Sequence, residues 1–500
     1  MSESGGNFEL RKFIAEYIGD DICAAKSGNA QQNHALDSLT AIQLANQLFA
    51  HFGLHIHPDN LSEKSLENIL EQIGGQAAFC RERRPTLSTN FAGNKTQTTS
   101  ATLDGPVLVE KAAVTSRSGG SSFAASILDP FDILSRSDKI YAKAARESGF
   151  ADFWNQVAPI ENDLVVAFVL EAFTDLGIDL SQLPRGAMVP RVPHLPQYDQ
   201  LVERIVEILK DRHVVEVYKG TIIRGSGCVD NVSSSTLCEF LLTEHPQFEC
   251  EIKLLGLVGP QLANCMTGKA NPISVLFGNT ESRQIMENFY REAPMMGAHV
   301  EQLVFFITSL LQKVPAGPSK PVQILEVGGG TGGITARVLH VVEAHDFPVQ
   351  YTFTDIGPSF VKQARIKWGQ TPWLQFALLN IEQEVSQSFR EKYDVVIGAN
   401  VVHATTDRVA ACRRLRETLR PGGLLVLSEV TRVIDWYDIC FGLLEGWWLA
   451  EGERGRAIQP AAIWIDVLRK AGFESVGHSV GDGSEEACSQ QLLVARKGMT

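Results

Sequence analysis

A histidine and a glutamate, each at the end of an apolar run, are the residues best suited to chemistry in this sequence. His403 closes the run DVVIGANVVH, and Glu429 closes LLVLSE. A carboxylate beside an imidazole fixes its tautomer and stabilises the imidazolium that forms when the ring takes a proton. If the fold brings the two side chains together, they form a general base. Taken singly, each has an ordinary alternative: a surface histidine after a strand, and an incidental glutamate.

A glycine-rich stretch, ILEVGGGTGGITARVL, predicts a strand, a tight loop and a helix in succession. Gly328, Gly330 and Gly333 satisfy the G-x-G-x-x-G spacing of dinucleotide sites. Such a loop lets the backbone approach a ligand closely, and the N-terminus of the helix favours a carboxylate or phosphate. A nicotinamide site and a purely structural glycine turn are the alternatives.

Three polar residues near this loop favour a different ligand. Glu326 ends the strand before the glycines, where an amino group could be bound. Asp355 ends the next strand candidate, YTFTD, and can accept hydrogen bonds from ribose hydroxyls. Asn380 follows the third candidate and is placed to meet an adenine edge. With the turn in LRPGGLLVLSE, this set resembles class I S-adenosylmethionine-dependent methyltransferases.

The elements that must position these residues alternate along the last part of the chain. Strand candidates separated by helical stretches predict an α/β, Rossmann-like, doubly wound parallel sheet; they are VQILEVG, VQYTFTD, LQFALLN, YDVVIGAN and GGLLVLSEV. In the class I methyltransferase topology the last two are neighbours, so His403 and Glu429 should meet at the carboxyl edge, where ligands of such folds bind. Thr331, in the glycine loop, and Asn400, after the fourth strand, complete the expected cofactor residues.

The rest of the chain divides by composition and pattern. Residues 8–76 predict a small all-α bundle, and residues 77–124, rich in Ser, Thr, Gly and Asn, predict a flexible linker. Residues 125–315 predict a mainly helical lid subdomain, with helical spacing in NDLVVAFVLEAFTDLGIDL and YDQLVERIVEILKDRHVVEVY and a small β element at GTIIRGSG. Residues 316–500 predict the methyltransferase core.

Bulk properties narrow the class of protein. The 500 residues carry a formal charge of −13, which argues against nucleic acid as a partner. Nine cysteines without a C-x-x-C pair predict neither a disulfide framework nor a metal site and favour a reducing compartment. No signal segment or long apolar run is apparent, so we expect a cytoplasmic protein that does not enter a membrane.

One serine near the front of the chain could carry a prosthetic arm. Ser38, in HALDSLTAIQL, follows an aspartate at the expected start of a helix, whose dipole favours a phosphodiester. The LDSL stretch resembles the 4'-phosphopantetheine site of acyl carrier proteins. Those proteins usually have glycine where this chain has Ala35, and a simple capping serine is the alternative.

Several separated motifs over residues 125–500 together resemble the C-methyltransferase domain of fungal non-reducing polyketide synthases. These are PISVLFGNTESRQIMENFYREAPMM, the glycine loop, ANVVHATTD, LSEVT and LLEGWWLAEGER. The resemblance implies that His403 and Glu429 are the catalytic dyad. It also implies that Tyr290 lies near cofactor and substrate. Trp447 and Trp448 are expected to line the acyl pocket or to pack a lid, with plain core packing as the alternative.

The resemblance implies a carrier domain joined to a C-methyltransferase. We expect it to methylate the α-carbon of a β-ketoacyl thioester, through an enolate, with S-adenosylmethionine as donor. The expected partners are a synthase with condensing and loading domains, which supplies the polyketide acyl thioester, and a phosphopantetheinyl transferase. The alternatives are a small-molecule O-methyltransferase with a vestigial carrier domain and a non-enzymatic docking subunit.

Overall fold

The structure is a computed structural model that describes residues 129–229, 232–313, 321–345, 347–448 and 456–499. The expected carrier unit, residues 8–76, lies outside the described residues, and so does its candidate attachment residue, Ser38. The expected linker, residues 77–124, also lies outside them. The fold below therefore concerns the region in which the methyltransferase motifs occur.

The first half of the described chain is mainly helical, as the apolar spacing predicts. Its helices are α6 (Pro130–Ser148), α7 (Phe153–Gln156), α8 (Ala158–Asp175), α9 (Asp199–Asp211), α10 (Ser234–Glu244), α11 (Glu249–Val258), α12 (Leu262–Met266), α13 (Pro272–Phe277), α14 (Thr280–Glu292) and α15 (Pro294–Leu311). Short 3-10 turns η1 (Pro196–Tyr198), η2 (Pro246–Phe248) and η3 (Gly259–Gln261) connect some of them.

A small antiparallel hairpin follows α9. Its strands are β1 (Val215–Tyr218) and β2 (Thr221–Arg224). The β element expected at GTIIRGSG is confirmed, but the helical interpretation of the preceding VEVY is wrong. Lys219 and Gly220 both have positive φ and form a tight turn, which folds VEVY back onto β2 as a strand.

The second half contains a seven-stranded sheet. Its strands are β3 (Val322–Val327), β4 (Val349–Asp355), β5 (Leu374–Leu378), β6 (Tyr393–Ala399), β7 (Leu419–Val430), β8 (Ser475–His478) and β9 (Gln490–Arg496). The connecting helices and turns are α16 (Gly333–His345), α17 (Pro358–Trp368), η4 (Val402–Ala404), α18 (Arg408–Thr418), α19 (Asp435–Cys440), η5 (Glu445–Trp447), α20 (Ala461–Lys470) and η6 (Glu486–Cys488).

The strand order in this sheet is β5-β4-β3-β6-β7-β9-β8. The five strands predicted from the sequence are parallel to one another, and β6 and β7 are neighbours. The expectation of an entirely parallel sheet is wrong at one side, because β9 is antiparallel to both β7 and β8. The sheet is therefore a mixed Rossmann-like sheet whose parallel part carries the predicted motifs.

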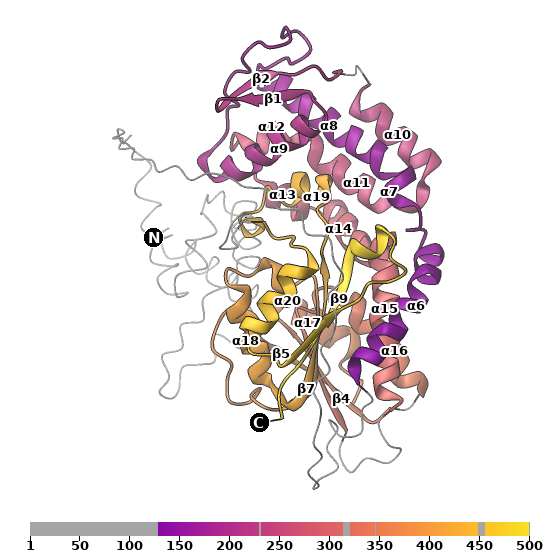
Figure 1. Cartoon of the computed structure of the whole chain (residues 1–500). Coiled ribbons are helices and arrows are strands. Elements are labelled where there is room, and N and C mark those ends of the chain that lie inside the picture. Colours follow the sequence, from indigo (N-terminus) through magenta and orange to yellow (C-terminus); the bar gives the residue numbers. More distant parts are fainter. Residues whose placement is uncertain (1–128, 230–231, 314–320, 346, 449–455, 500) are drawn as a thin grey trace, which may run out of the picture. The chain divides into compact units, whose positions relative to one another are not determined.

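Helices cover both faces of the sheet (Figure 1). One face packs against α6, α15, α16 and α17, and the other packs against α18 and α20. Among the described helices, α15 alone is long and apolar enough to cross a membrane, and 72% of that window is buried inside the fold. Its residues Leu303, Phe306 and Leu310 pack on the sheet. In this position α15 is a core helix.

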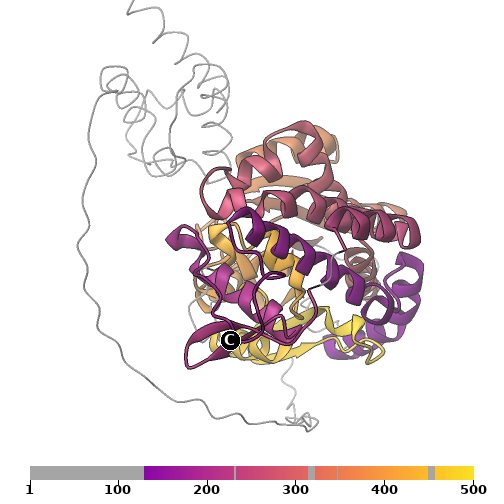
Figure 2. The ribbon, with the colours of Figure 1, turned by 90° about the horizontal axis from the view of Figure 1, so that it is seen from above.

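The helical half has its own core, and one later helix joins it. Side chains from α7 to α14 form a second apolar cluster, together with Trp436, Tyr437 and Phe441 of the α19 region. α19 packs against α8, α9 and α11 of the helical half, which Figure 1 shows above the sheet and Figure 2 shows in front of it in the view from above. The segment after β7 therefore connects the carboxyl end of this strand to the helical half.

Candidate functional site

The glycine loop joins β3 to α16 at the carboxyl edge of the sheet. Gly328 and Gly330 have φ values of +62° and +52°, a region that side chains other than glycine's rarely adopt. A Cβ on Gly328 would lie 1.8 Å from the Cγ2 atom of Val401, so this glycine lets the loop pack against the residues after β6. A Cβ on Gly330 would meet no atom closer than 4.0 Å. Gly330 therefore borders open space that a ligand could fill.

Asp355, at the end of β4, anchors this loop. Its Oδ2 atom accepts a hydrogen bond of 2.8 Å from the Gly330 N–H, and its Oδ1 atom accepts one of 2.8 Å from the Gly357 N–H. The carboxylate is buried. Thr331, on the same loop, is exposed. The carboxylate expected to bind ribose thus also holds the glycine loop to the neighbouring strand.

Glu326 points into the fold. Its Oε2 atom accepts hydrogen bonds from the hydroxyls of Thr335, at 2.7 Å, and Tyr351, at 2.9 Å. Burial raises the pKa of this carboxyl to about 7. These contacts tie β3 to α16 and β4, so the structure gives Glu326 an internal bracing position in addition to the ligand contact expected from the sequence.

Two asparagines occupy the loops after β5 and β6. Asn380 is half-buried, and its Oδ1 atom accepts a hydrogen bond of 2.8 Å from the Glu382 N–H. Asn400 has a positive φ of 51°, and its N–H donates to the Ser428 carbonyl. Its Oδ1 atom is buried and has no hydrogen-bond partner within the described part of the chain. A buried acceptor of this kind needs a donor, and a ligand amine or hydroxyl could supply one.

These features fit S-adenosylmethionine. The open space at Gly330 allows backbone to approach the ligand, the Asp355 carboxylate lies beside it, and the N-terminus of α16 follows it. The unpartnered Asn400 oxygen is an acceptor at the same edge. The acceptor oxygens suit the hydroxyls and the amino group of such a ligand, and the N–H groups at the start of α16 suit its carboxylate.

His403 and Glu429 are hydrogen-bonded to each other. The Nδ1 atom of His403 lies 2.7 Å from the Oε2 atom of Glu429. The other oxygen, Oε1, accepts from the backbone N–H groups of Val401, at 3.2 Å, and Val402, at 2.9 Å. A carboxylate oxygen accepts and does not donate, so the contact places the proton of His403 on Nδ1 and leaves Nε2 to accept one.

The local structure explains how the pair forms. β6 and β7 run in parallel register up to Ala399 and Ser428, and Glu429 is the next residue of β7. The short turn η4 then brings His403 back over the end of β7. Glu429 is fully buried, while the His403 side chain is 16% exposed. The imidazole can therefore be reached from outside the fold, and the carboxylate that it contacts cannot.

The predicted aromatic residues lie in different places. The ring of Trp447 is 6.1 Å from that of His403, centroid to centroid, and nearly perpendicular to it. Trp448 donates its indole N–H to the Gly442 carbonyl at 2.7 Å. Tyr290, on α14, is 43% exposed, and its carbonyl oxygen lies 3.8 Å from where a Cβ on Gly333 would be. Trp447 and Tyr290 thus border the dyad and the glycine loop, respectively.

The sequence interpretation missed two residues behind Trp447. Asp438 accepts the indole N–H of Trp447 at 2.8 Å, and Arg204 donates to the same carboxylate at 2.7 Å. Both are buried. No motif connects them, because they are separated by 234 positions. The sole signal in the sequence was the aspartate content of the segment DWYDIC, in which Asp438 lies nine residues before Trp447.

Family profiles match two parts of the chain. A profile described as "Methyltransferase, Helix-turn-helix domain" matches residues 135–222, in the helical half. A profile described as "Methyltransferase domain" matches residues 325–425, which include the glycine loop and the loop after β6. The two matches correspond to the helical half and the sheet half of the fold.

Relatives and solved structures narrow the family. The non-reducing polyketide synthase atr1 of Stereocaulon alpinum is 34% identical over 99% of this chain and 20% of its own length. The CurJ carbon methyltransferase is 26% identical, with a TM-score of 0.65 over 74% of this chain and all of that one. This chain spans about a fifth or less of the length of the full synthases that it matches.

The CMeT domain of the citrinin polyketide synthase is similar over almost its whole length. It is 32% identical to this chain, and the two structures superpose with a TM-score of 0.72 over 75% of this chain and 98% of that domain. The chain therefore belongs to the C-methyltransferase (CMeT) domains of polyketide synthases.

Proposed function

We propose that this chain transfers a methyl group to the α-carbon of a β-ketoacyl chain held as a thioester. The observation that carries the proposal is the hydrogen-bonded pair of His403 and Glu429 at the carboxyl edge of the sheet. Transfer to an amine or a thiolate needs little base catalysis. Transfer to carbon requires loss of a C–H proton first, and an oriented imidazole meets that requirement.

The proposed chemistry assigns one role to each member of the pair. His403 takes the α-proton on Nε2, the electron pair of the C–H bond remains on the acyl chain as an enolate, and Nδ1 keeps its proton. Glu429 holds the ring in this tautomer and stabilises the imidazolium that forms. S-adenosylmethionine, when bound beside Gly330 and Asp355, would supply the methyl group for the new carbon–carbon bond and, as its sulfur–methyl bond breaks, would leave as S-adenosylhomocysteine.

The acyl chain would arrive on a carrier. We propose that Ser38 bears a phosphopantetheine arm, added by a phosphopantetheinyl transferase, and that the condensing and loading activities come from the rest of a larger synthase. The relatives named as polyketide synthases support this setting, because the chain matches a short part of each. Tethering would raise the local substrate concentration into about the millimolar range.

The test of the reaction uses the full chain, S-adenosylmethionine with an isotopically labelled methyl group, and acetoacetyl-pantetheine. The expected product carries the label on the α-carbon, identified by its chemical shift and fragment mass. Label on oxygen, or methylation of a free phenol in preference to the thioester, would instead establish an O-methyltransferase. Binding of the methyl donor without any product would favour a docking subunit.

The carrier assignment has a separate test. The intact mass of the full chain is measured with coenzyme A and a phosphopantetheinyl transferase, alongside Ser38→Ala. We expect a gain of one phosphopantetheine in the unmodified sequence and none in the variant. A folded chain that gains no mass would leave Ser38 as a helix cap and require a carrier on another chain.

A further inference from the structure

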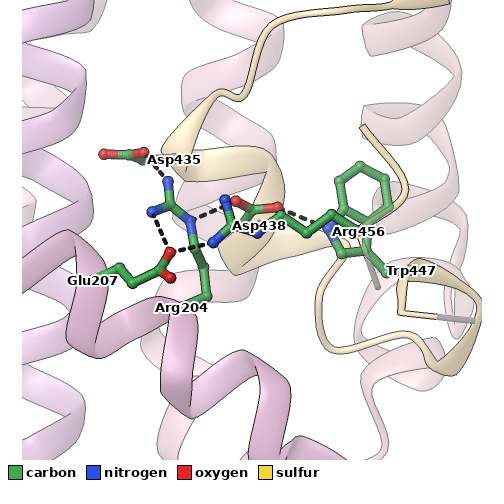
Figure 3. A network of polar contacts seen from close by, with 6 residues as sticks. All are labelled: Arg204, Glu207, Asp435, Asp438, Trp447 and Arg456. Carbon is green, nitrogen blue, oxygen red and sulfur yellow. Dashed lines mark hydrogen bonds and ion pairs between the residues drawn. The ribbon is translucent and has the colours of Figure 1, made fainter. Parts of the chain in front are cut away.

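A buried arginine from the helical half holds the segment that borders the base. Arg204, on α9, is 6% exposed. It donates through Nε to the Oδ2 atom of Asp438 at 2.7 Å, and its other nitrogens pair with Asp435 and Glu207 (Figure 3). A buried guanidinium is stable only when it is paired and hydrogen-bonded in this way. Arg204 thus holds one oxygen of the Asp438 carboxylate, Oδ2, in place.

The other oxygen of the Asp438 carboxylate accepts a hydrogen bond from a tryptophan. Its Oδ1 atom accepts the indole N–H of Trp447 at 2.8 Å, and the Asp438 side chain is almost fully buried (Figure 3). Because Arg204 already determines where this carboxylate lies, the position of the acceptor also limits the rotation of the indole. Hydrogen bonds to an ionised acceptor are shorter and stronger than those between neutral groups.

Trp447 in turn stands beside the base. Its ring lies 6.1 Å from the His403 ring at an interplanar angle of 75°, and 5.4 Å from the ring of Phe441. Direct contacts therefore run from Arg204 through Asp438 and Trp447 to His403. They connect α9 and α19 of the helical cluster to the turn after β6.

Arg456 extends the same network. It pairs with Glu207, which also accepts from Arg204 (Figure 3). The N–H of Ala457, the next residue, donates to the Trp447 carbonyl at 3.0 Å. The backbone of Trp447 is thus held as well as its indole. The network therefore fixes the whole residue, and Asp438 is the point through which it controls the ring.

We propose that Asp438 and Arg204 are positioning residues that hold Trp447 as the wall of the acceptor pocket beside His403. The inference rests on the proposed function, in which the acyl chain must bring its α-carbon to Nε2 of His403, whose ring lies 6.1 Å from this indole. A fixed aromatic wall limits where the acyl chain can lie and favours the orientation that exposes its α-proton to the base. The helical half would then select the acceptor, while the sheet supplies the base.

The kinetic test compares Trp447→Phe, Asp438→Asn and the double variant in the full chain. We expect each single variant to raise KM for acetoacetyl-pantetheine by about tenfold, the effect of losing one hydrogen bond to a charged group. The affinity for S-adenosylmethionine should stay the same. If Asp438 acts through the indole, the double variant should be no worse than Trp447→Phe. Additive losses, or unchanged KM in either single variant, would overturn the proposal.

Two further variants serve as controls. Trp154→Phe removes an indole N–H that donates to Ser489 at 2.9 Å and not to Asp438, and should leave KM unchanged. Arg204→Lys keeps the charge but loses the fork that reaches Asp438 and Asp435 together. It should raise KM in the same direction as Asp438→Asn. Wild-type KM in a folded Arg204→Lys would remove Arg204 from the proposal.

An NMR experiment tests the position of Trp447 independently of the proposed methylation. The chain has seven tryptophans, so labelled indoles give few N–H signals, and the one lost in Trp447→Phe belongs to Trp447. In Asp438→Asn that signal should shift and exchange faster with solvent, while the Trp154 signal stays. An unmoved Trp447 signal would overturn the positioning role even if methylation occurs. Absence of methylation by the unmodified chain would overturn the proposed function and leave this result standing.

Discussion

The proposed cofactor side and the proposed acceptor side of the site are built in different ways. On the cofactor side, one continuous segment from β3 through the glycine loop to α16 supplies the backbone, and Asp355 anchors it from the next strand. On the acceptor side, Trp447 is placed by side chains from α9 and α19. Local backbone geometry defines the cofactor side, and hydrogen bonds between residues far apart in the sequence define the acceptor side.

Because of this difference, substitutions on the two sides should affect different measurable quantities. Changes in the glycine loop or at Asp355 should alter the affinity for the methyl donor. Changes at the dyad or behind Trp447 should alter the turnover number or the KM for the acceptor and leave donor affinity alone. A variant that alters the quantity expected of the other side would weaken the distinction.

The largest effect should come from Glu429→Gln. Glu429 accepts from Val401 and Val402 N–H through Oε1 and contacts His403 Nδ1 through Oε2, and glutamine has only one oxygen to offer. If that oxygen keeps the backbone bonds, the glutamine NH2 group faces Nδ1–H, so His403 must turn away or move its proton to Nε2. The imidazole then loses its orientation, and we expect turnover to fall by about a hundredfold or more. Initial rates and calorimetric titration with the methyl donor provide the check. A loss of donor affinity with normal turnover would contradict the assignment to the acceptor side.

Two glycine variants should have different main effects, one on the stability of the fold and the other on the affinity for the methyl donor. Gly328→Ala places a Cβ within 1.8 Å of Val401, so the loop must shift and the melting temperature should fall by several degrees, with a cost of about 1–3 kcal/mol. Gly330→Ala meets no nearby atom and should cost about 1 kcal/mol for its positive φ. Its main effect should be on donor affinity, because the new methyl group enters the open space.

Thermal melting and donor titration of both glycine variants are the measurements. Equal donor affinity in Gly330→Ala and the unmodified chain would mean that the open space beside this residue is not the cofactor site. The two variants form a matched pair, since each adds one methyl group to a residue with positive φ in the same loop.

Asp355→Ala should weaken donor binding by about tenfold, because it removes the carboxylate expected to bind ribose and also frees the Gly330 N–H. At saturating donor, the KM for the acceptor should stay near its normal value. Isothermal titration with S-adenosylhomocysteine measures the first quantity without turnover. Unchanged affinity would remove Asp355 from the cofactor side.

The smallest effect should be a change in the pH dependence of stability in the helical half. Burial raises the pKa of Glu251 to about 8, and its Oε2 atom has no hydrogen-bond partner within the described residues. Glu161 and Tyr437 lie close enough to interact with its charge. Because the folded-state pKa lies above that of an unfolded glutamate, the stabilisation is complete at acid pH and is lost as pH rises toward 8.

Glu251→Gln removes this titration. The variant should lose less melting temperature than the unmodified chain between about pH 6 and about pH 9. Glu244→Gln, at an exposed position on α10, is the control and should follow the unmodified chain. Parallel melting curves for all three chains would show that Glu251 ionises without cost. The variant should leave donor affinity unchanged.

The sequence predicted the parts of the fold that depend on local pattern. The five parallel strands and the loop between β3 and α16 were predicted, because apolar runs punctuated by glycine identify buried strands. Strands β8 and β9 were not predicted. β8 has only four residues, and the antiparallel pairing of β9 with β7 and β8 is a tertiary arrangement that no local pattern encodes.

The same limit applies to the site. His403 and Glu429 could be found because each ends a strand and the two strands are neighbours in the topology that the resemblance implies. Arg204 and Asp438 could not, since nothing near either residue indicates the other. Their pairing depends on how α9 packs against α19, which is decided by the apolar core of the helical half.

The most direct test of the account is whether His403 removes the α-proton. The full chain is incubated with acetoacetyl-pantetheine in deuterated buffer without methyl donor, and α-proton exchange is followed by NMR. The unmodified chain and the exposed-position control His340→Ala should accelerate exchange equally, and folded His403→Ala should lose about a hundredfold or more of that acceleration. Acceleration by His403→Ala equal to that of the unmodified chain would contradict the central claim.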